Sequence, residues 1–489
     1  MRQVVFVPLV LLGLHFCHQR DATSAEAIEG AASVSDTRAP NVLFIAIDDL
    51  RPQLACYGQK QMHTPNFDAL AKRSVLFDRA YCMVPTCGAS RASLMTGMRP
   101  SPARFISYTA RADRETPDAV TLNTIFKRSG YTTISLGKVF HFVDDNASGW
   151  SESPWTSKLD DYHNAPLQES AIAEHRRKYP NRKKVRGMPY ESFEAPDSQY
   201  RDHETTSKAI EYLERFSRSE KPFFLAVGFN KPHLPFCAPK RYWDLYQPDD
   251  IQLPLNDAPP AGAPLGAVHA SGELRAYATI PPSGAVSVET ARSLIHGYYA
   301  CVSFVDAQLG RIMKHLDESG LADNTIIVLW GDHGWQLGEH GMWNKHSCFE
   351  TSMHAPLMIA APGFARAMRC SSLTEFIDIY PTLCDLSGIA VPTQVQGVSL
   401  RPWLEDPSHD GKSQAVGRFQ SGDTVRSDRY RYTEYRGEGG RGHLTGTMLY
   451  DHRLDPAENT NLAGVPELRT DQRQLQEWLE EQKGKDTPD

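Results

Sequence analysis

The sequence predicts an α/β fold, in which helices cover a mostly parallel sheet, with a smaller C-terminal α+β subdomain. Short apolar runs rich in branched residues recur along the chain, and stretches with helical spacing separate them. From about Gly411 the pattern changes to shorter segments in which polar and apolar residues alternate, as in antiparallel strands. The length of 489 residues also exceeds what one hydrophobic core usually organises. We therefore expect two domains, at residues 39–408 and 409–489.

Five apolar runs are the expected strands of the parallel sheet. The first, residues 41–48, is a continuous apolar segment, which suits a strand that is buried on both faces. Four later runs have the same character and are separated by helical patterns, so we place all five in one sheet. These four runs are residues 132–136, 223–229, 325–330 and 356–361.

Apolar residues at helical spacing indicate the helices that cover this sheet. The longest pattern covers residues 288–319 and stops before Gly320, since glycine commonly ends helices. Two shorter patterns cover residues 122–128 and 205–216. These segments alternate with the apolar runs, which is the arrangement that a largely parallel sheet requires.

The C-terminal subdomain is expected to hold an antiparallel sheet with one helix packed against it. The glycine-rich stretch at residues 437–446 predicts a loop between two of its strands. Residues 467–482 carry leucines and a tryptophan on one side, which predicts an amphipathic helix. The expected strands are residues 415–420, 430–435 and 448–452.

The start of the chain and its composition bear on where the protein works and on its partners. Met1 and Arg2 precede an apolar run at residues 4–16 and then small residues, which predicts a signal peptide at 1–27, a linker at 28–38, and export to a periplasmic, extracellular or lysosome-like compartment. No other run approaches about 20 apolar residues, so no stable membrane span is expected. A lipid anchor at Cys17 is a less favoured alternative. The net charge of -7 argues against nucleic acid as a partner.

Acidic, basic and metal-ligating residue types follow four of the expected strands. Ligands in open α/β sheets collect at the carboxyl ends of the strands, so these residues are expected to meet at one edge of the sheet. Asp48 and Asp49 end the first strand, Lys138 and His141 follow strand 132–136, Lys231 and His233 follow strand 223–229, and Asp332 and His333 follow strand 325–330.

Asp48, Asp49 and Asp332 are candidate metal ligands. An isolated pair of aspartates more often caps a turn, but the second acidic strand end favours a shared site. Carboxylates brought together without an equal number of cations would repel each other unless a hard divalent cation held them. Oxygen ligands from separate loops favour calcium, with magnesium as the less favoured ion.

The segment at residues 84–97 carries the strongest functional signal, because Cys87 is followed at a fixed spacing by Arg91 and then by Thr96 and Gly97. A lone cysteine is more often a small buried hydrophobic residue, but the whole pattern reverses that interpretation. The segment resembles the signature of the type I sulfatases, C-x-(P/A)-x-R followed by a short helix and T-G. The resemblance extends over most of the chain and is closest to the iduronate 2-sulfatase branch. The other matching segments are residues 41–49, 137–141, 231–236, 331–341 and 450–459.

The resemblance implies an alkaline-phosphatase-like fold and hydrolysis of sulfate esters on a sulfated carbohydrate. In this family the cysteine is oxidised after translation to formylglycine, by a formylglycine-generating or sulfatase-maturating enzyme. The hydrated aldehyde attacks sulfur, and the sulfated intermediate collapses back to the aldehyde and expels sulfate. Carried over to this sequence, the calcium ligands are Asp48, Asp49, the modified Cys87, Asp332 and His333.

The resemblance also implies roles for the basic residues. Arg91 braces the formylglycine, while fixed positive charge around the sulfate oxygens, from Lys138, His233 and Lys345, stabilises the transition state. His141 is the candidate base and His233 the candidate acid, although these two roles could be exchanged. Taken singly, a histidine is at least as often structural, and a loop lysine usually faces solvent.

Several features of the sequence leave alternatives open. Position 89 is alanine where the iduronate branch has proline, so the efficiency of Cys87 conversion and the enzyme responsible stay undetermined. Lys231 and His340 are weaker candidates for the sulfate pocket. The basic run at residues 176–186 could grip a polyanionic glycan, but a solvated loop is the favoured interpretation.

The remaining cysteines carry little information about function. The sequence has nine, without the close spacing of a zinc cluster. Removing Cys17 with the signal peptide and reserving Cys87 for chemistry leaves an odd number, so at least one thiol is expected to be free. No disulfide pairing is predicted.

Two other functions are kept as alternatives. A phosphodiesterase or phosphonate hydrolase could use the same nucleophile against phosphorus. A glycan-binding protein without catalysis would result if Cys87 were never oxidised. The sugar, the position of its sulfate, endo or exo action and the oligomeric state are not predicted.

Overall fold

A computed structural model describes residues 38–182 and 184–485 of the chain. The predicted signal peptide and nearly all of the predicted linker lie outside these residues. Residues from Ala39 onward form one compact unit, so the boundary that we place between residues 408 and 409 stays a prediction.

A seven-stranded sheet forms the centre of this unit, in the order β11-β2-β10-β7-β1-β5-β3. Neighbouring strands are parallel except at β10, which is antiparallel to both β7 and β2. The mostly parallel sheet predicted from the sequence is therefore confirmed, and it has two strands, β2 and β11, beyond the five expected. The strands are β1 (Asn41–Ile47), β2 (Val75–Tyr81), β3 (Thr132–Gly137), β5 (Phe223–Phe229), β7 (Thr325–Gly331), β10 (Leu357–Ala360) and β11 (Met368–Glu375).

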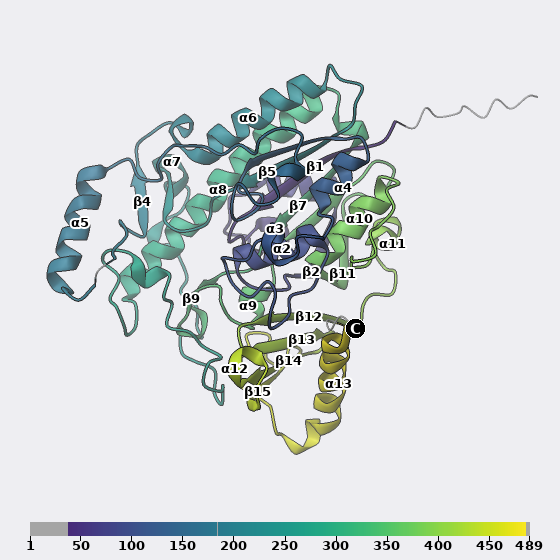
Figure 1. Cartoon of the computed structure of the whole chain (residues 1–489). Coiled ribbons are helices and arrows are strands. Elements are labelled where there is room, and N and C mark those ends of the chain that lie inside the picture. Colours follow the sequence, from purple (N-terminus) through teal and green to yellow (C-terminus); the bar gives the residue numbers. More distant parts are fainter. Residues whose placement is uncertain (1–37, 183, 486–489) are drawn as a thin grey trace, which may run out of the picture. The chain divides into compact units, whose positions relative to one another are not determined.

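Helices cover both faces of the sheet, and the side-chain alternation of β1 shows how. Leu43, Ile45 and Ile47 belong to a core that includes side chains of α6 (Arg201–Phe216) and α8 (Val288–Glu318). The intervening residues of β1 face a second core, which includes side chains of α2 (Cys87–Thr96), α4 (Leu122–Arg128) and α10 (Ile379–Leu386). Because both faces are buried, the strand reads as one continuous apolar run. Figure 1 shows α6 and α8 side by side.

The predicted helices are present with small shifts at their ends. Residues 122–128 form α4 as expected, while α6 begins earlier than predicted, at Arg201. The long helix α8 ends at Glu318, and Gly320 has a positive φ of 70°, which suits glycine as the residue that ends a helix. No helix within residues 38–182 and 184–485 has the length and apolarity to cross a membrane.

The C-terminal part contains a four-stranded antiparallel sheet, β12 (Gln414–Phe419), β13 (Gly422–Ser427), β14 (Tyr430–Arg436) and β15 (Leu444–Asp451). Leu475 and Leu479 of α13 (Arg469–Lys485) pack on this sheet beside Val425 and Tyr432, as the amphipathic pattern predicts. The predicted loop at residues 437–446 is shorter than expected, because α12 (Gly437–Gly440) and the start of β15 occupy part of it.

Smaller elements complete the described part of the chain. They are α1 (Pro65–Ala71), α3 (Ala112–Glu115), β4 (Tyr190–Phe193), α5 (Ala165–Lys178), β6 (Phe236–Pro239), α7 (Lys240–Trp243), β8 (Gln336–Leu337), β9 (Trp343–Asn344), α9 (Glu350–Met353) and α11 (Arg401–Glu405).

Candidate active site

The carboxyl ends of β7, β1, β5 and β3 lie next to one another in the sheet, and we call this edge the catalytic rim. Asp48 and Asp49 follow β1, Asp332 follows β7, His233 lies beyond β5 and Lys138 follows β3. A close approach at the end of β3 needs two glycines: a Cβ on Gly137 would lie 2.1 Å from the carbonyl oxygen of Gly228. The structure thus brings the polar ends of four separate strands together.

Cys87 is the first residue of α2 and points at the same rim. Its Sγ lies 3.3 Å from Nε2 of His333 and donates to Oδ1 of Asp49 at 3.8 Å. The side chain is almost fully buried. Burial raises the pKa of the thiol well above its ordinary value, and the charge on Asp48 raises it further. The unmodified thiol is therefore a poor nucleophile, because only the thiolate reacts readily.

Arg91, one turn further along α2, fixes the ends of two strands. Its Nε donates to Oδ2 of Asp332 at 2.9 Å, and its Nη2 donates to Oδ1 of Asp48 at 3.2 Å. Its Nη1 also donates to the carbonyl oxygens of Lys138 and Val139. Burial works against the charge, but Asp332 and Asp48 outweigh it and raise the pKa of Arg91. The guanidinium is therefore a fixed positive charge below the rim.

Two lysines also contact the aspartates. Nζ of Lys138 pairs with Oδ2 of Asp48, and Nζ of Lys345 lies 3.1 and 3.2 Å from the two carboxylate oxygens of Asp49. Together with Arg91 these lysines match the three aspartates in number. Repulsion between the aspartates therefore does not by itself require a metal ion.

The geometry of the donor atoms nevertheless fits a divalent cation. One atom each from Asp48, Asp49, Cys87 and His233 lie within 4.8 Å of one another. A second such group consists of Cys87, Asp332 and His333. Ligands on opposite sides of a calcium ion are about 5 Å apart, because each lies about 2.3–2.6 Å from the ion. The rim is therefore a possible metal-binding cluster.

A cavity of about 470 Å³ opens beside the rim, and Asp48, Lys138, His141 and His233 are among its lining residues. Burial and the nearby charge of Lys138 lower the pKa of His141 to about 4, so its imidazole is neutral at ordinary pH and able to accept a proton. Among the described residues, Nδ1 of His141 has no hydrogen-bond partner.

His233 differs from His141 in its charge. Burial works against protonation of His233, but the attraction of Asp49 outweighs it and raises the pKa of the imidazole. Its Nε2 lies 3.1 Å from a carboxylate oxygen of Glu273, and its Nδ1 lies 2.6 Å from the carbonyl oxygen of Leu234. The structure therefore places one neutral and one cation-favouring histidine at the same cavity.

The two weaker candidates, Lys231 and His340, are held by contacts with other parts of the chain. Lys231 lines the cavity, but its Nζ donates to the carbonyl oxygen of Pro235 at 2.6 Å and pairs with Asp161 at 3.2 Å. Nε2 of His340 lies 2.8 Å from the carbonyl oxygen of Ala457, so this side chain points away from the cationic side chains assigned to the sulfate. Both side chains are thus occupied by contacts that hold loops in place.

The described part of the basic run is largely exposed. Arg176, Arg177 and Lys178 form the exposed end of α5, and Lys184 and Arg186 are also exposed. This agrees with the favoured interpretation of a solvated segment.

Glu273 is a rim residue that the sequence did not reveal. It precedes a short turn of helix in an aperiodic segment between α7 and α8, and its carboxylate lies 2.9 Å from Nζ of Lys345. A single glutamate in such a segment gives no spacing or motif from which this contact could be inferred. Only the three-dimensional approach of this segment to β9 places it there.

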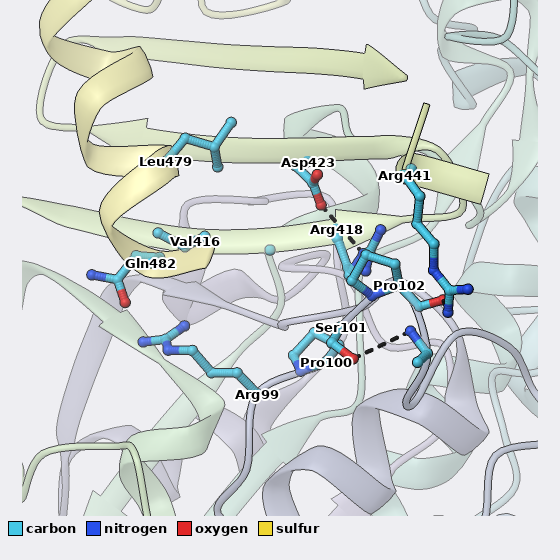
Figure 2. Close-up of a pocket in the computed structure, with 13 residues that line it drawn as sticks. Arg99, Pro100, Ser101, Pro102, Val416, Arg418, Asp423, Arg441, Leu479 and Gln482 are labelled. Carbon is cyan, nitrogen blue, oxygen red and sulfur yellow. Dashed lines mark hydrogen bonds and ion pairs between the residues drawn. The ribbon is translucent and has the colours of Figure 1, made fainter. Parts of the chain in front are cut away.

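A second cavity, of about 400 Å³, lies between the loop that begins at Arg99 and the C-terminal sheet (Figure 2). Two of its basic side chains are in ion pairs, Arg99 with Glu375 at 2.6 Å and Arg418 with Asp423 at 3.3 Å, and Arg441 donates to the carbonyl oxygen of Pro102 at 3.1 Å. Leu479 of α13 closes one side. Lys138, His141 and His233, three of the catalytic residues expected from the sequence, line the cavity at the rim instead.

Residues 40–389 match the family model described as Sulfatase. The chain belongs to the sulfatase family. Residues 338–485 of this sulfatase also match the model described as N-sulphoglucosamine sulphohydrolase, C-terminal. The family expected from the Cys87 segment is therefore confirmed, and the protein is a hydrolase that acts on sulfate esters.

Two curated relatives and one solved structure illustrate the similarity. This sulfatase is 35% identical to iduronate 2-sulfatase of Homo sapiens over 405 residues, 73% of this chain and 70% of the relative. It is 34% identical to a sulfatase of Formosa agariphila, over 87% of this chain and 83% of the relative. A phosphonate monoester hydrolase of Agrobacterium radiobacter superposes with a TM-score of 0.72 at 23% identity, over 92% and 96% of the two chains. The fold is the alkaline-phosphatase-like one found in solved sulfatases.

Proposed function

We propose that this sulfatase removes sulfate from a sulfated saccharide of the kind that iduronate 2-sulfatase acts on, with a formylglycine made from Cys87 and a bound calcium ion. The observation that carries the proposal is the position of the Cys87 Sγ, 3.8 Å from Asp49 and 3.3 Å from His333 at the rim. The similarity to human iduronate 2-sulfatase supports the substrate class.

Formylglycine explains why a buried, poorly ionised thiol stands at this position. Oxidation by a maturating enzyme converts the thiol to an aldehyde. Its hydrate supplies a hydroxyl that displaces the alcohol at sulfur and then releases sulfate as the aldehyde forms again. The short distances from Cys87 to Asp49 and His333 leave the new group among the metal-type ligands.

Lys138 and Lys345 stabilise the negative charge that develops on the sulfuryl oxygens, and Arg91 braces the formylglycine at residue 87. All three positive charges are held by aspartates before the substrate arrives, so little reorganisation is needed in the transition state. Water is largely excluded from Arg91 and Lys345, which strengthens their effect.

The two histidines divide the proton transfers. As the bond between sulfur and the alcohol oxygen breaks, His233 donates a proton to that oxygen, which suits its raised pKa. His141 accepts the proton of the hydroxyl on residue 87, which suits its neutral state. Both side chains line the same cavity, so one bound ester could reach both.

Asp48, Asp49, Asp332, His333 and the modified residue 87 are the proposed calcium ligands. A bound calcium ion would supply positive charge beside the sulfate. Calcium is proposed rather than magnesium because the donor set is dominated by carboxylates from separate loops.

We also propose that the protein is exported, because a signal-peptide pattern precedes the catalytic chain.

Three measurements test the function. The protein should be expressed with a maturating enzyme, and the peptide that contains Cys87 should weigh about 18 Da less than its cysteine form. Desulfation should then be followed on a panel of defined sulfated saccharides, together with an aryl sulfate and an aryl phosphonate ester. Removal of metal with a chelator should abolish activity, and added calcium should restore it.

The outcomes separate the alternatives. Preference for the phosphonate ester would replace the proposal with a phosphonate hydrolase, whose fold the chain shares. An unmodified Cys87 with retained binding of sulfated saccharide would favour a glycan-binding protein without catalysis.

A further inference from the structure

Glu273 joins two residues of the catalytic rim that come from different elements. Its carboxylate lies 3.1 Å from Nε2 of His233, beyond β5, and 2.9 Å from Nζ of Lys345, just after β9. Only 16% of the Glu273 side chain is exposed, so water screens these contacts weakly. One carboxylate therefore fixes two of the cationic groups to which we assign contacts with the sulfate ester.

The segment that carries Glu273 is held by the backbone around Lys345. Nε2 of His269 donates to the carbonyl oxygen of Lys345 at 2.6 Å, and the amide of Trp343 donates to Oγ of Ser271 at 2.9 Å. These two contacts lie on the N-terminal side of Glu273. On its C-terminal side, the amide of Leu274 donates to Oδ1 of Asn344. The position of Glu273 relative to Lys345 is therefore built into the fold.

Glu273 and Asp49 share the same ammonium group. Nζ of Lys345 is 2.9 Å from Glu273 and 3.1 Å from Asp49. Of these two carboxylates, only Asp49 would attract Lys345 if Glu273 lost its charge. The lysine would then neutralise a carboxylate that we propose as a metal ligand, and His233 would lose its nearest anionic partner.

We propose that Glu273 is a positioning residue, which holds Lys345 and His233 toward the sulfate ester and shares the charge of Lys345 with Asp49, so that Asp49 is neutralised only in part. This role rests on the proposed function of the same site. It gives Glu273 two separable effects: one on turnover, through the orientation of the two cations, and one on metal affinity, through the charge left on Asp49.

Glu375 offers a matched control. Its carboxylate also bridges two cations, Arg99 at 2.6 Å and Lys412 at 2.7 Å, but it is only 2% exposed and lines a third cavity, which no rim residue lines. Glu375→Gln therefore removes the same charge from the same kind of bridge outside the catalytic rim.

The test compares Glu273→Gln, Glu273→Asp and Glu375→Gln in matured full-length protein. We measure kcat and KM on the sulfate ester that the wild type hydrolyses fastest, the calcium affinity by titration calorimetry, and the melting temperature. Glu273→Gln should lower kcat/KM about tenfold to a hundredfold and weaken calcium binding about threefold to tenfold. Glu273→Asp, which keeps the charge, should recover most of the calcium affinity and part of kcat. Glu375→Gln should lower the melting temperature without either change.

The proposal is overturned if Glu273→Gln alters the melting temperature alone, or if Glu375→Gln changes kcat and calcium affinity to the same extent. If Glu273→Gln does not fold, Glu273→Asp decides: a kcat equal to that of the wild type would overturn the positioning role, because the shorter side chain does not keep both contacts. An inactive wild type with verified formylglycine would overturn the proposed function instead, and the calcium titration would still test Glu273.

Discussion

The catalytic rim and a second site beneath the C-terminal sheet each bury acidic and histidine side chains whose donor atoms lie within 4.8 Å of one another. At the second site, which we call the junction cluster, these residues are Glu350, His452 and Glu458, together with Arg431 of β14. By residue type alone, both groups could hold a metal.

Contacts within the junction cluster show why it differs. Arg431 is 1% exposed, pairs with Glu350, and lies 2.9 Å from a carboxylate oxygen of Glu458. The amide of Glu350 donates to the other oxygen of Glu458 at 2.7 Å, and Tyr81 donates to Glu350 at 2.8 Å. A fixed guanidinium already occupies the space between the two glutamates, where a metal ion would have to lie.

At the rim, by contrast, two of the basic side chains near the aspartates line the cavity. The side chains of Lys138 and His233 are 16% and 22% exposed and line the opening. A ligand that enters the cavity can therefore compete for them. Buried charge marks a reactive site here only where the partner cations are accessible and an oxidisable thiol stands beside them.

Replacement of Cys87 tests the reactive half of this comparison and should give the largest effect. Cys87→Ala removes the precursor of the nucleophile, so kcat should fall at least about a thousandfold. Cys82→Ala is the control, because Cys82 is also a buried thiol but its Sγ points to the carbonyl oxygen of Ser352. Activity of the Cys87→Ala variant above about a hundredth of wild type would show that another group attacks sulfur.

Replacement of Arg431 tests the structural half. Arg431→Met removes the buried cation that Glu350 and Glu458 share and leaves them with Arg426 at 3.4 Å and His452 at 3.0 Å, which should lower the free energy of unfolding by about 3–5 kcal/mol. The turnover of the molecules that remain folded should be unchanged. Arg429→Met is the control: Arg429 pairs with Asp451 on the same sheet but is 39% exposed, so the loss should be much smaller. Equal losses in urea denaturation would contradict the distinction.

The same distinction shows which parts of the molecule the sequence could predict. Strands β1, β5 and β7 are buried on both faces and read as uninterrupted apolar runs, so their positions, and the residues that follow them, could be inferred. Strand β2 was missed because Asp78 and Arg79 interrupt its apolar run, and edge strand β11 because its first half is largely exposed.

Contacts between distant segments were beyond sequence reasoning. The lysines that balance the aspartates could be named but not paired, and Glu273 could not be named at all. Its partners lie on other elements, and no periodic pattern links them. The sequence therefore identified the rim residues that follow strands of the sheet. It did not identify Glu273, which lies in the long connection between α7 and α8.

Acid should weaken the junction cluster. Burial opposes ionisation of Glu350 and Glu458, but Arg431 and their other partners outweigh it and lower both pKa values below the ordinary 4.5. The stability that these carboxylates contribute is complete above pH 4.5, where the unfolded chain is also ionised. It is lost as pH falls below 4.5, because these carboxylates are then protonated in the unfolded chain while they are still ionised in the folded one.

Urea denaturation between pH 7 and pH 3 measures this effect. The free energy of unfolding should decline below about pH 4.5 in the wild type, and the decline should be shallower in Arg431→Met, because the two pKa values return toward ordinary ones. At the catalytic rim the shifts have opposite directions: the pKa of Asp48 is lowered and that of Asp49 is raised. An equally steep decline in Arg431→Met would place the acid sensitivity elsewhere.

The smallest effect is expected for charged side chains that are exposed and form no ion pair with a rim residue. Arg176 and Arg177 are exposed at the end of α5. Replacing both with alanine should leave kcat/KM on a small sulfate ester within about twofold of wild type, because exposed charges are largely screened beyond about 10 Å at 0.1 M salt. The same ratio should hold for a sulfated polysaccharide, if the basic run is only a solvated segment. A loss confined to the polysaccharide, and diminished at higher salt, would instead assign these arginines to glycan binding and extend the functional surface beyond the sheet edge.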